Sequence, residues 1–379
     1  MRIAHIADIH VQDRRREEYA AVFVALAARL GAETPRPTVT AIAGDVFDTM
    51  SKASAWNWED VATLLSLLAE VAPVVIIPGN HDLNVRAAGA PDLISPMLRA
   101  AGGARNLQPP RVTYWRTSDV REFAGAVWVA GVPGQVPPAP EAVKAALETA
   151  APGVPLIGLY HESVGGARYS NGLEVGETPL NKTTLGALAA AAGKNRPLAI
   201  LLGDIHLRQR VPFPGHGPAA AAWYSGSLVC QNFGESHLGH GYLLWDLKVA
   251  EGGAPPSVRV TPREVPNPHS LLTIRLGPAG EDRTPEPRPE NPWAYRVAYD
   301  PAAPAEAVAA AIATASAQYG FAARGVEATE GPAGPPPAPP GRLETPPGGL
   351  AAAPGGPLAA AWAAGNDWAH HAAAARALL

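Results

Sequence analysis

Five short segments rich in Asp, His and Asn constrain the fold of this 379-residue chain more than any other feature. Each segment directly follows an apolar run of the kind that forms a buried β-strand. In an α/β protein, ligands bind where strands run into loops, so the sequence predicts that the five segments form one site. The segments are Asp8-Ile9-His10, Gly44-Asp45-Val46-Phe47-Asp48, Gly79-Asn80-His81-Asp82, Tyr160-His161-Glu162 and Gly203-Asp204-Ile205-His206.

The side chains of these segments suit a pair of divalent cations. Carboxylates, an Asn carbonyl and imidazoles together favour Mn, Fe or Zn. Zinc held by several thiolates is excluded, because Cys230 is the only cysteine of the chain. Two ions roughly 3.5 to 4 Å apart can activate a hydroxide and hold the phosphoryl oxygens during in-line displacement. The sequence therefore predicts phosphoester hydrolysis.

The five segments resemble the motifs of the calcineurin-like metallophosphoesterase superfamily, and the resemblance implies a role for each ligand. Asp204 departs from the usual Gly-His-x-His motif, but a carboxylate is a competent ligand for Mn or Mg, so we expect an occupied site with an altered metal preference. We expect two Mn ions, with Mg, Fe or Zn as alternatives. By this resemblance the first ion is held by Asp8, His10 and His206, the second by Asn80, His161 and Asp204, and Asp45 bridges the two.

Two further residues are predicted to transfer protons. His81 adjoins the ligand Asn80, so its imidazole can face the leaving-group oxygen and protonate it near neutral pH. Asp48 matches the position from which related phosphatases orient that His, where a carboxylate would fix the tautomer and raise the basicity of the ring. Any one Asp or His near a strand end is more often a helix cap or a turn residue. The ordered set of five segments favours catalysis over that simpler interpretation.

Within the superfamily, the chain resembles the SbcD-type DNA exonucleases and their phage relatives. The resemblance rests on residues 44–49, 202–209, 224–228 and 231–235 and covers about residues 1 to 265. It implies a two-metal DNA exo/endonuclease that hydrolyses phosphodiester bonds in DNA repair, recombination or phage replication. The expected partners are DNA, an SbcC-type coiled-coil ATPase and a second copy of the chain in a homodimer.

Two other functions fit the same ligands. One is a phosphodiesterase or phosphatase acting on nucleotides or phosphoprotein, although segment 224–235, which lies outside the metal set, favours the nuclease. The other is a binding module that keeps its metals after losing catalysis, and the presence of both His81 and Asp48 argues against it. The net charge of -4 excludes a basic nucleic-acid coat. The candidates for local DNA contacts are Arg14, Arg15, Arg16, Arg208 and Arg210, with a solvated helical turn as the alternative for the first three.

The expected architecture is an α/β protein whose residues 1–266 form a catalytic domain of two β-sheets packed face to face, with helices outside. Helices are expected over Glu17–Leu30, Trp56–Val71, Glu141–Ala150 and Thr183–Ala192. The late strands Gly241–Leu247 and Ser257–Thr261 are expected to close the second sheet. The sequence has no apolar run that could span a bilayer, and a single cysteine cannot form an internal disulfide. We therefore expect a cytoplasmic enzyme without a signal peptide and without membrane contact.

Beyond the catalytic domain, residues 270–329 are expected to form a smaller α/β unit. By position, the resemblance implies a capping domain that lies over the active site and helps to select the shape of the DNA. Residues 331–357 contain too little apolar side chain to form a core and are predicted to be a linker rich in Pro and Gly. Residues 358–379 are predicted to form a short Ala-rich helix that binds a partner, with a frayed tail as the alternative.

Overall fold

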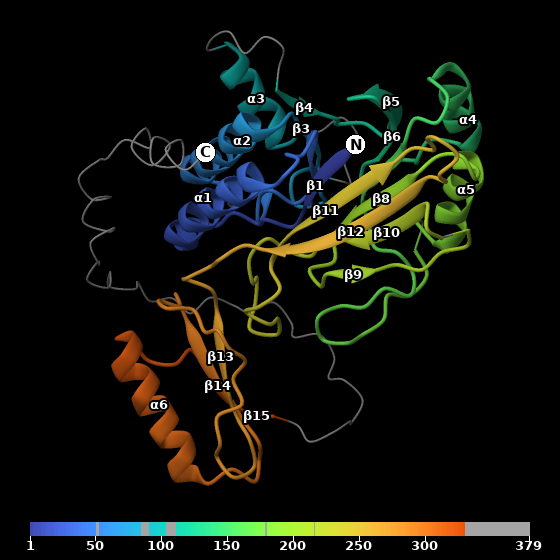
Figure 1. Ribbon diagram of the computed structural model, residues 1–379. Helices are drawn as coiled ribbons and strands as arrows, with labels where there is room; N and C mark the ends of the chain where they lie inside the picture. The colour runs from blue at the N-terminus through green and yellow to red at the C-terminus, as the bar shows by residue number, and fades with distance from the viewer. Residues whose placement is uncertain (51–52, 85–90, 104–110, 179, 216, 330–379) are drawn as a thin grey trace.

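The computed structural model describes residues 1–50, 53–84, 91–103, 111–178, 180–215 and 217–329, and its main body is a pair of six-stranded sheets packed face to face (Figure 1). Helices cover the outer face of each sheet, which confirms the predicted α/β sandwich. Within the described ranges, no helix has both the length and the hydrophobicity that crossing a bilayer requires.

The first sheet has the strand order β12-β11-β1-β2-β3-β4. Its central strands β1 to β4 are parallel, which sends their carboxyl ends to one edge of the sheet. The helix α2 begins at a capping box in which Ser54 and Asn57 satisfy each other's backbone N–H groups. The elements are β1 (Arg2–Ile6), β2 (Val39–Ala43), β3 (Val74–Ile77), β4 (Val112–Tyr114), β11 (Gly241–Lys248), β12 (Ser257–Glu264), η1 (Asp13–Arg15), α1 (Arg16–Ala32), α2 (Ala55–Val71) and α3 (Ile94–Gly103).

The late strands do not close the second sheet, and that prediction was wrong. β11 pairs antiparallel with β1, in a register that places Leu244 opposite Ala4, and β12 pairs with β11. The β11–β12 hairpin is visible as the gold ribbon beside the blue strand β1 (Figure 1). The physical reason is that β1 has an unpaired edge on the side away from β2, and β11 satisfies its backbone groups while burying Leu243 and Trp245 between the sheets.

The second sheet has the strand order β5-β6-β7-β8-β10-β9, with β6, β7, β8 and β10 parallel. Its inner strands are buried along their whole length, as expected for strands covered on both faces. The elements are β5 (Asp119–Phe123), β6 (Ala126–Gly131), β7 (Leu156–His161), β8 (Leu198–Gly203), β9 (Gln209–Arg210), β10 (Ala220–Tyr224), α4 (Pro140–Thr149) and α5 (Lys182–Ala192).

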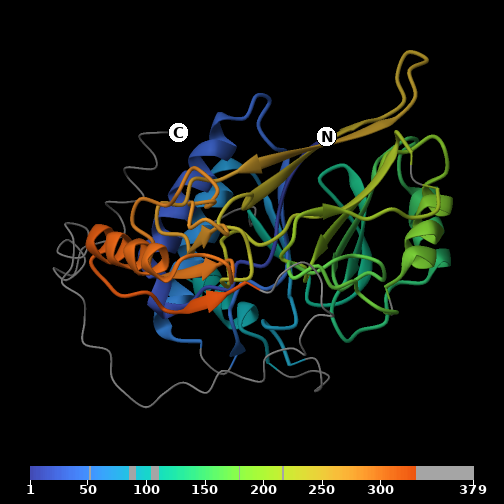
Figure 2. The ribbon, with the colours of Figure 1, turned by 90° about the horizontal axis from the view of Figure 1, so that it is seen from below.

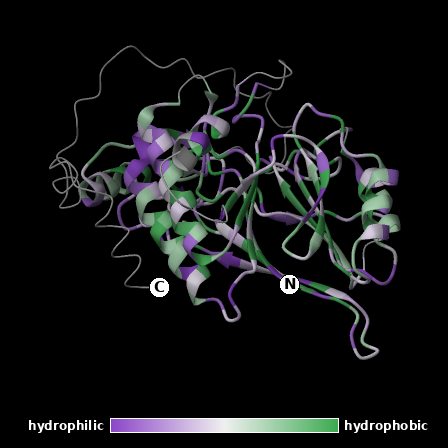
Figure 3. Cartoon of the chain, turned by 90° about the horizontal axis from the view of Figure 1, so that it is seen from above, coloured by the Kyte–Doolittle hydropathy of each residue, from purple (hydrophilic) through white to green (hydrophobic). Residues whose placement is uncertain are grey.

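Apolar side chains fill three layers of the main body. Between the sheets, Ile3 and Trp245 of the first sheet pack with Trp128 and Leu159 of the second, all fully buried. The other two layers lie between each sheet and its helices. The inner strands of the two sheets are accordingly drawn mostly in green, the colour of hydrophobic residues (Figure 3). This packing holds the strand ends in place, and the five polar segments directly follow these ends.

Residues 270–329 form a separate lobe with its own small core (Figures 1 and 2). Three parallel strands, β13 (Leu272–Leu276), β14 (Tyr295–Tyr299) and β15 (Val326–Ala328), pack against the helix α6 (Ala305–Tyr319). The three strands and the helix make residues 270–329 a small α/β unit. Its role as a capping domain stays a prediction. The predicted linker 331–357 and C-terminal helix 358–379 lie outside the described residues.

Candidate metal centre

The two sheets bring all seven predicted metal ligands to one place. The first sheet supplies four ligands from the ends of β1, β2 and β3, and the second supplies three from the ends of β7 and β8. Each of the seven contacts another member of the set by a side-chain or backbone group. The first four are Asp8, His10, Asp45 and Asn80, and the other three are His161, Asp204 and His206.

The first half of the site consists of Asp8, His10 and His206. Their donor atoms lie within 4.8 Å of one another, and the Nε2 atoms of the two imidazoles face each other at 3.1 Å. Asp8 is fully buried, and its carboxylate accepts a hydrogen bond of 3.0 Å from the backbone N–H of Asp204. Two imidazole nitrogens and a carboxylate in this arrangement offer one divalent ion three protein ligands.

The second half of the site adjoins the first through Asp45. The Oδ2 atom of Asp45 lies 3.3 Å from His161 Nε2 and 3.5 Å from His10 Nε2, so one carboxylate oxygen lies between the two groups of donors. His161 Nε2 also lies 2.9 Å from Asn80 Oδ1. The position of Asp45 is the one that a bridging carboxylate needs, and the donor set as a whole fits two divalent ions.

Asp204 lies at the edge of the site. Its Oδ1 atom is 3.9 Å from His161 Nε2, and its Oδ2 atom accepts a hydrogen bond from Ser163 Oγ. Its side chain is 26% exposed, in contrast to the buried Asp8 and Asp45. The role of Asp204 as a ligand stays a prediction. Together with Asn80, His161, Ser163 and their neighbours, it lines an open cavity of about 280 Å³ that leads to the second half of the site.

His81 lies beside the donors, as predicted, but Asp48 does not orient it in the predicted way. The ring of His81 packs edge-on against the ring of His10, with centroids 4.9 Å apart. Its Nδ1 atom contacts the backbone carbonyl of Asp48, not the carboxylate. The carboxylate is held elsewhere, because its Oδ1 atom accepts a hydrogen bond of 3.0 Å from Gln12 Nε2. The carbonyl contact favours the tautomer with a proton on Nδ1 and leaves Nε2 for other partners.

Four of the predicted ligands have a left-handed backbone. The φ angles are 52° at Asp8, 51° at His10, 52° at Asp45 and 94° at Asp204. Residues other than glycine rarely adopt such angles, and strain of about 1 to 3 kcal/mol each persists where the surrounding structure imposes it. The left-handed residues therefore turn the backbone sharply after β1, β2 and β8, and these turns direct the side chains toward the site.

Two carboxylates that received no role from the sequence support the centre. Asp82 is fully buried and accepts hydrogen bonds from the backbone N–H groups of Val46, Phe47 and Gly79, so it joins the loops that carry Asp45 and Asn80. Glu235 accepts a hydrogen bond of 2.9 Å from His206 Nδ1 and fixes that ring with Nε2 toward the site. Asp82 lies within one of the five polar segments. The only sequence signal for Glu235 was that it lies in segment 231–235, which resembles the SbcD-type exonucleases.

Burial and neighbouring charges shift the pKa values of the site. Burial raises the pKa of Asp8 to about 7. Burial also opposes the charge on Asp45, but the nearby His161 outweighs it and holds the pKa of that carboxyl below its usual range. For His206, burial disfavours the imidazolium, yet the hydrogen bond to Glu235 and the charge of Asp8 raise its pKa to about 9. The site therefore concentrates negative charge that protons or cations must balance.

Several of the basic residues predicted to contact DNA have partners within the protein, and their contact with DNA stays a prediction. Arg15 is 2% exposed and forms an ion pair of 2.6 Å with Glu18. Arg16 pairs with Glu59 and Asp60, and the Arg208 Nε atom donates to the carbonyl of Ser225. The Arg14 Nε atom donates a hydrogen bond to Gln12 Oε1, and its guanidinium lies over the ring of Trp293. Arg210 is exposed on β9. The acidic partners of Arg16 are 43 and 44 positions away in the sequence, whereas Glu18 is only three positions from Arg15.

Comparison with known proteins supports the coarse chemistry of the site. Residues 1–126 match the family model for calcineurin-like phosphoesterases, a family of metal-dependent hydrolases that act on phosphoesters. The chain is also 29% identical over 252 residues to "Uncharacterized protein R555" of Acanthamoeba polyphaga mimivirus. The matched region covers 65% of this chain but only 17% of that viral protein. The family match includes the segments that carry Asp8, His10, Asp45 and Asn80.

Proposed function

We propose that this chain is a two-metal DNA exo/endonuclease that hydrolyses phosphodiester bonds. The observation that carries the proposal is the position of Asp45 Oδ2, between His161 Nε2 and His10 Nε2, with His206 and Asn80 completing the donors on either side. Divalent ions held by these residues would supply Lewis-acid stabilisation of the phosphoryl oxygens and a nucleophile from water. Oxygen donors from Asp8, Asp45, Asn80 and Asp204 favour Mn over softer ions.

His81 is the proposed proton donor to the leaving group. Its Nδ1 atom faces the Asp48 carbonyl, so in the imidazolium form the Nε2 atom holds the proton that the leaving oxygen takes. The edge-on contact with His10 and the hydrogen bond of 2.9 Å from the His81 backbone N–H to Asp45 Oδ1 keep the residue beside the donor set. Asp48 supports this role through its backbone carbonyl.

Support for DNA as the substrate comes from segment 224–235. This segment carries the resemblance to the SbcD-type exonucleases outside the ligand set, and it lies against the metal centre. Gln231 donates a hydrogen bond of 3.0 Å to the carbonyl of Ile9, and Glu235 holds His206. An SbcC-type coiled-coil ATPase is the proposed partner, and the lobe 270–329 is the proposed capping domain.

One observation favours a second candidate, a phosphodiesterase that acts on nucleotides. Arg15, Arg16 and Arg208 are engaged in internal contacts, which leaves fewer groups near the site for the phosphates of a long polyanion. A substrate with a single phosphodiester needs fewer such contacts.

The two candidates differ in a cleavage assay. End-labelled single- and double-stranded DNA and the small diester bis(p-nitrophenyl) phosphate are incubated with the purified chain in Mn, Mg, Zn or chelator, and Asp45→Asn serves as the inactive control. Mn-dependent DNA cleavage is expected. Hydrolysis of the small diester without DNA cleavage, with or without a coiled-coil ATPase, would favour the nucleotide phosphodiesterase. Failure on every substrate would contradict both.

A further inference from the structure

The loop between β10 and β11 contacts the metal centre on one side. The Glu235 carboxylate is 6% exposed and accepts hydrogen bonds from His206 Nδ1 at 2.9 Å, from the Gln231 backbone N–H at 2.8 Å and from Asn232 Nδ2 at 2.7 Å. Gln231 Nε2 donates to the carbonyl of Ile9, which lies between two predicted ligands. The conformation of this loop therefore determines where the His206 imidazole points.

On its other side, the same loop is held by the lobe 270–329. The backbone carbonyl of Phe233 accepts a hydrogen bond of 2.6 Å from Arg296 Nη2 on β14 and another of 3.3 Å from Thr273 Oγ1 on β13. The Arg296 guanidinium also lies 5.6 Å from the centroid of the Phe233 ring. A charge-assisted hydrogen bond to a partly buried carbonyl is a strong constraint. The carbonyl that it constrains is two residues before Glu235.

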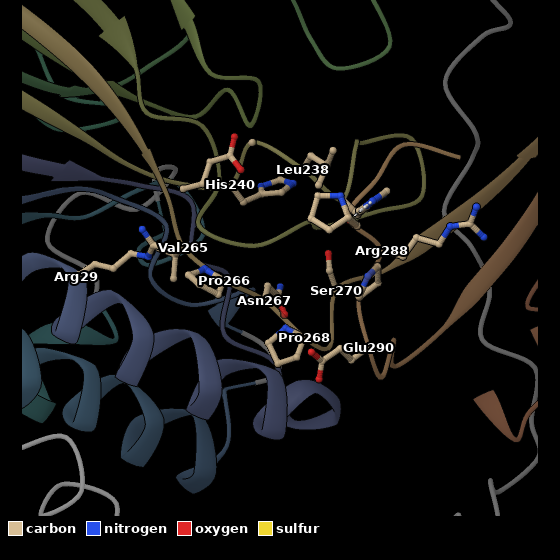
Figure 4. Close-up of a pocket in the computed structure, with 15 residues that line it drawn as sticks. Arg29, Leu238, His240, Val265, Pro266, Asn267, Pro268, Ser270, Arg288 and Glu290 are labelled. Atoms are coloured by element: carbon tan, nitrogen blue, oxygen red, sulfur yellow. Dashed lines mark hydrogen bonds between the residues drawn. The ribbon is translucent and has the colours of Figure 1, made fainter. Parts of the chain in front are cut away.

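A cavity of about 570 Å³ lies between the lobe and the main body (Figure 4). Arg29 of α1 and Arg288 of the lobe lie at opposite ends of the cavity, and Pro266 and Pro268 of the connecting segment line it. The lobe and the loop meet at the Arg296–Phe233 hydrogen bond and at a small apolar cluster that joins Cys230 and Phe233 to Leu271, Trp293 and Ala294. A displacement of β14 would therefore pull directly on the loop that holds His206.

Arg296 also has a purely structural interpretation. Its Nη1 atom forms an ion pair of 3.0 Å with Glu327 Oε2 on β15, and its Nε atom donates to Thr273 Oγ1. These contacts lie within the lobe. The Glu327 side chain is 61% exposed, and exposed ion pairs contribute about 0 to 1 kcal/mol. Removal of Glu327 therefore separates this contribution from the contact with Phe233.

We infer that Arg296 is a positioning residue for the metal centre. It holds the Phe233 carbonyl, the loop then places Glu235, and Glu235 orients His206. The inference rests on the proposed two-metal site and adds to it a mechanical link from the lobe to one ligand. An outer residue of this kind acts on the affinity for the ion that its ligand holds.

The test is titration of the full chain with Mn²⁺ alone, by isothermal calorimetry, with no substrate present. Arg296→Ala is expected to weaken the ion held by His206 about tenfold and to leave the other ion unchanged, because loss of outer partners costs about 10- to 100-fold in metal affinity. Arg296→Lys keeps a donor for the Phe233 carbonyl and should recover part of the loss. Glu327→Gln is the matched control and should bind both ions like the unmodified chain.

Several outcomes separate this inference from the proposed function. If the unmodified chain binds no Mn²⁺, the proposed two-metal site is wrong. If it binds two ions and folded Arg296→Ala binds them equally well, or if Glu327→Gln loses the same affinity, Arg296 is not a positioning residue. Should Arg296→Ala not fold by circular dichroism, Arg296→Met keeps most of the side-chain volume and removes every guanidinium donor to the Phe233 carbonyl. An unchanged Mn²⁺ affinity in that folded variant would then overturn the inference.

Discussion

At the scale of single residues, the side chains that meet at the candidate metal centre could be predicted because each stands in a short motif. The partners that orient them could not. Glu235 reaches His206 across 29 positions of the chain, and the partner of His81 is a backbone carbonyl of Asp48 instead of its side chain. Backbone groups carry no residue identity, and the pairing of Glu235 depends on how a loop folds back on the site. Both contacts are consequences of the tertiary structure.

Residues 81 and 45 are expected to respond differently to substitution. His81→Asn should lower turnover by about 10² to 10⁴-fold, the usual contribution of a general acid, with two ions still bound. Asp45→Asn should lose bound metal, because it removes the charge of the shared oxygen. Elemental analysis of both dialysed proteins, alongside hydrolysis rates, measures the two effects. Equal metal loss in the two variants would identify His81 as a ligand. His81 lies close enough to His10 and Asp45 to bind an ion with them.

The pKa of His206 predicts how metal binding depends on pH. Because the Glu235 hydrogen bond raises this pKa to about 9, His206 is protonated at pH 7 before an ion binds, and the imidazole must lose that proton to become a ligand. Mn²⁺ affinity should therefore rise between pH 7 and pH 9, with release of a proton. Calorimetry at pH 7 in buffers of different ionisation enthalpy counts the protons. Glu235→Gln lowers the pKa of His206 and should reduce the count, and an unchanged count would contradict the assignment.

At the scale of secondary-structure elements, periodicity predicted α1, α2, α4 and α5 and the strands that precede the polar segments, whereas α3 and β4 were not predicted. The sheet that a strand joins did not follow from periodicity. The sequence of β11 shows a buried strand, and either sheet could bury it. The edge of β1 decides the pairing through backbone hydrogen bonds that any sequence could make. The strands that carry the predicted ligands illustrate a second point. The carboxyl ends of β2 and β8 lie so close together that a larger side chain at some positions would collide with the opposite strand.

Gly203, at the end of β8, shows this close approach. A Cβ atom at this position would overlap the carbonyl of Ala43 at the end of β2 and would lie 2.7 Å from His161 Nδ1. Gly203→Ala should therefore push the two sheets apart at the metal centre, weaken Mn²⁺ binding and lower the free energy of unfolding by about 1 to 3 kcal/mol. Gly176→Ala is the control, since no atom lies within 4 Å of its added Cβ. Urea unfolding and calorimetry should distinguish the two variants, and equal behaviour would refute the proposed steric conflict.

At the scale of the whole molecule, the α/β sandwich and the extra lobe could be predicted from the alternation of strands and helices. The contacts between lobe and main body could not, since they combine single hydrogen bonds such as Arg296 to Phe233 with an apolar cluster of residues far apart in the sequence. The net charge of the chain likewise said little about the surface near the site, where Arg16 pairs with the distant Glu59 and Asp60. Long-range pairing is a property of the folded molecule.

Metal removal should destabilise the molecule as a whole. Asp8 and Asp45 are buried close together, and ions that bind only the folded state stabilise it by about 2.7 kcal/mol at a free concentration 100 times Kd. The melting temperature should accordingly rise with added Mn²⁺ and fall in chelator. Differential scanning calorimetry measures the shift. Asp45→Asn should melt at the same temperature in both conditions, and a metal-independent melting temperature in the unmodified chain would argue against two bound ions.

The facing imidazoles of His10 and His206 come from positions 196 residues apart. During synthesis on the ribosome, a nascent chain that ends before β8 lacks one of these donors and has no complete binding place for the first ion. Even after β8 emerges, His206 stays without its orienting carboxylate until residue 235 is made. Hydrolytic capacity would therefore arise late and all at once, so that incomplete translation products would be harmless to the phosphodiesters around them.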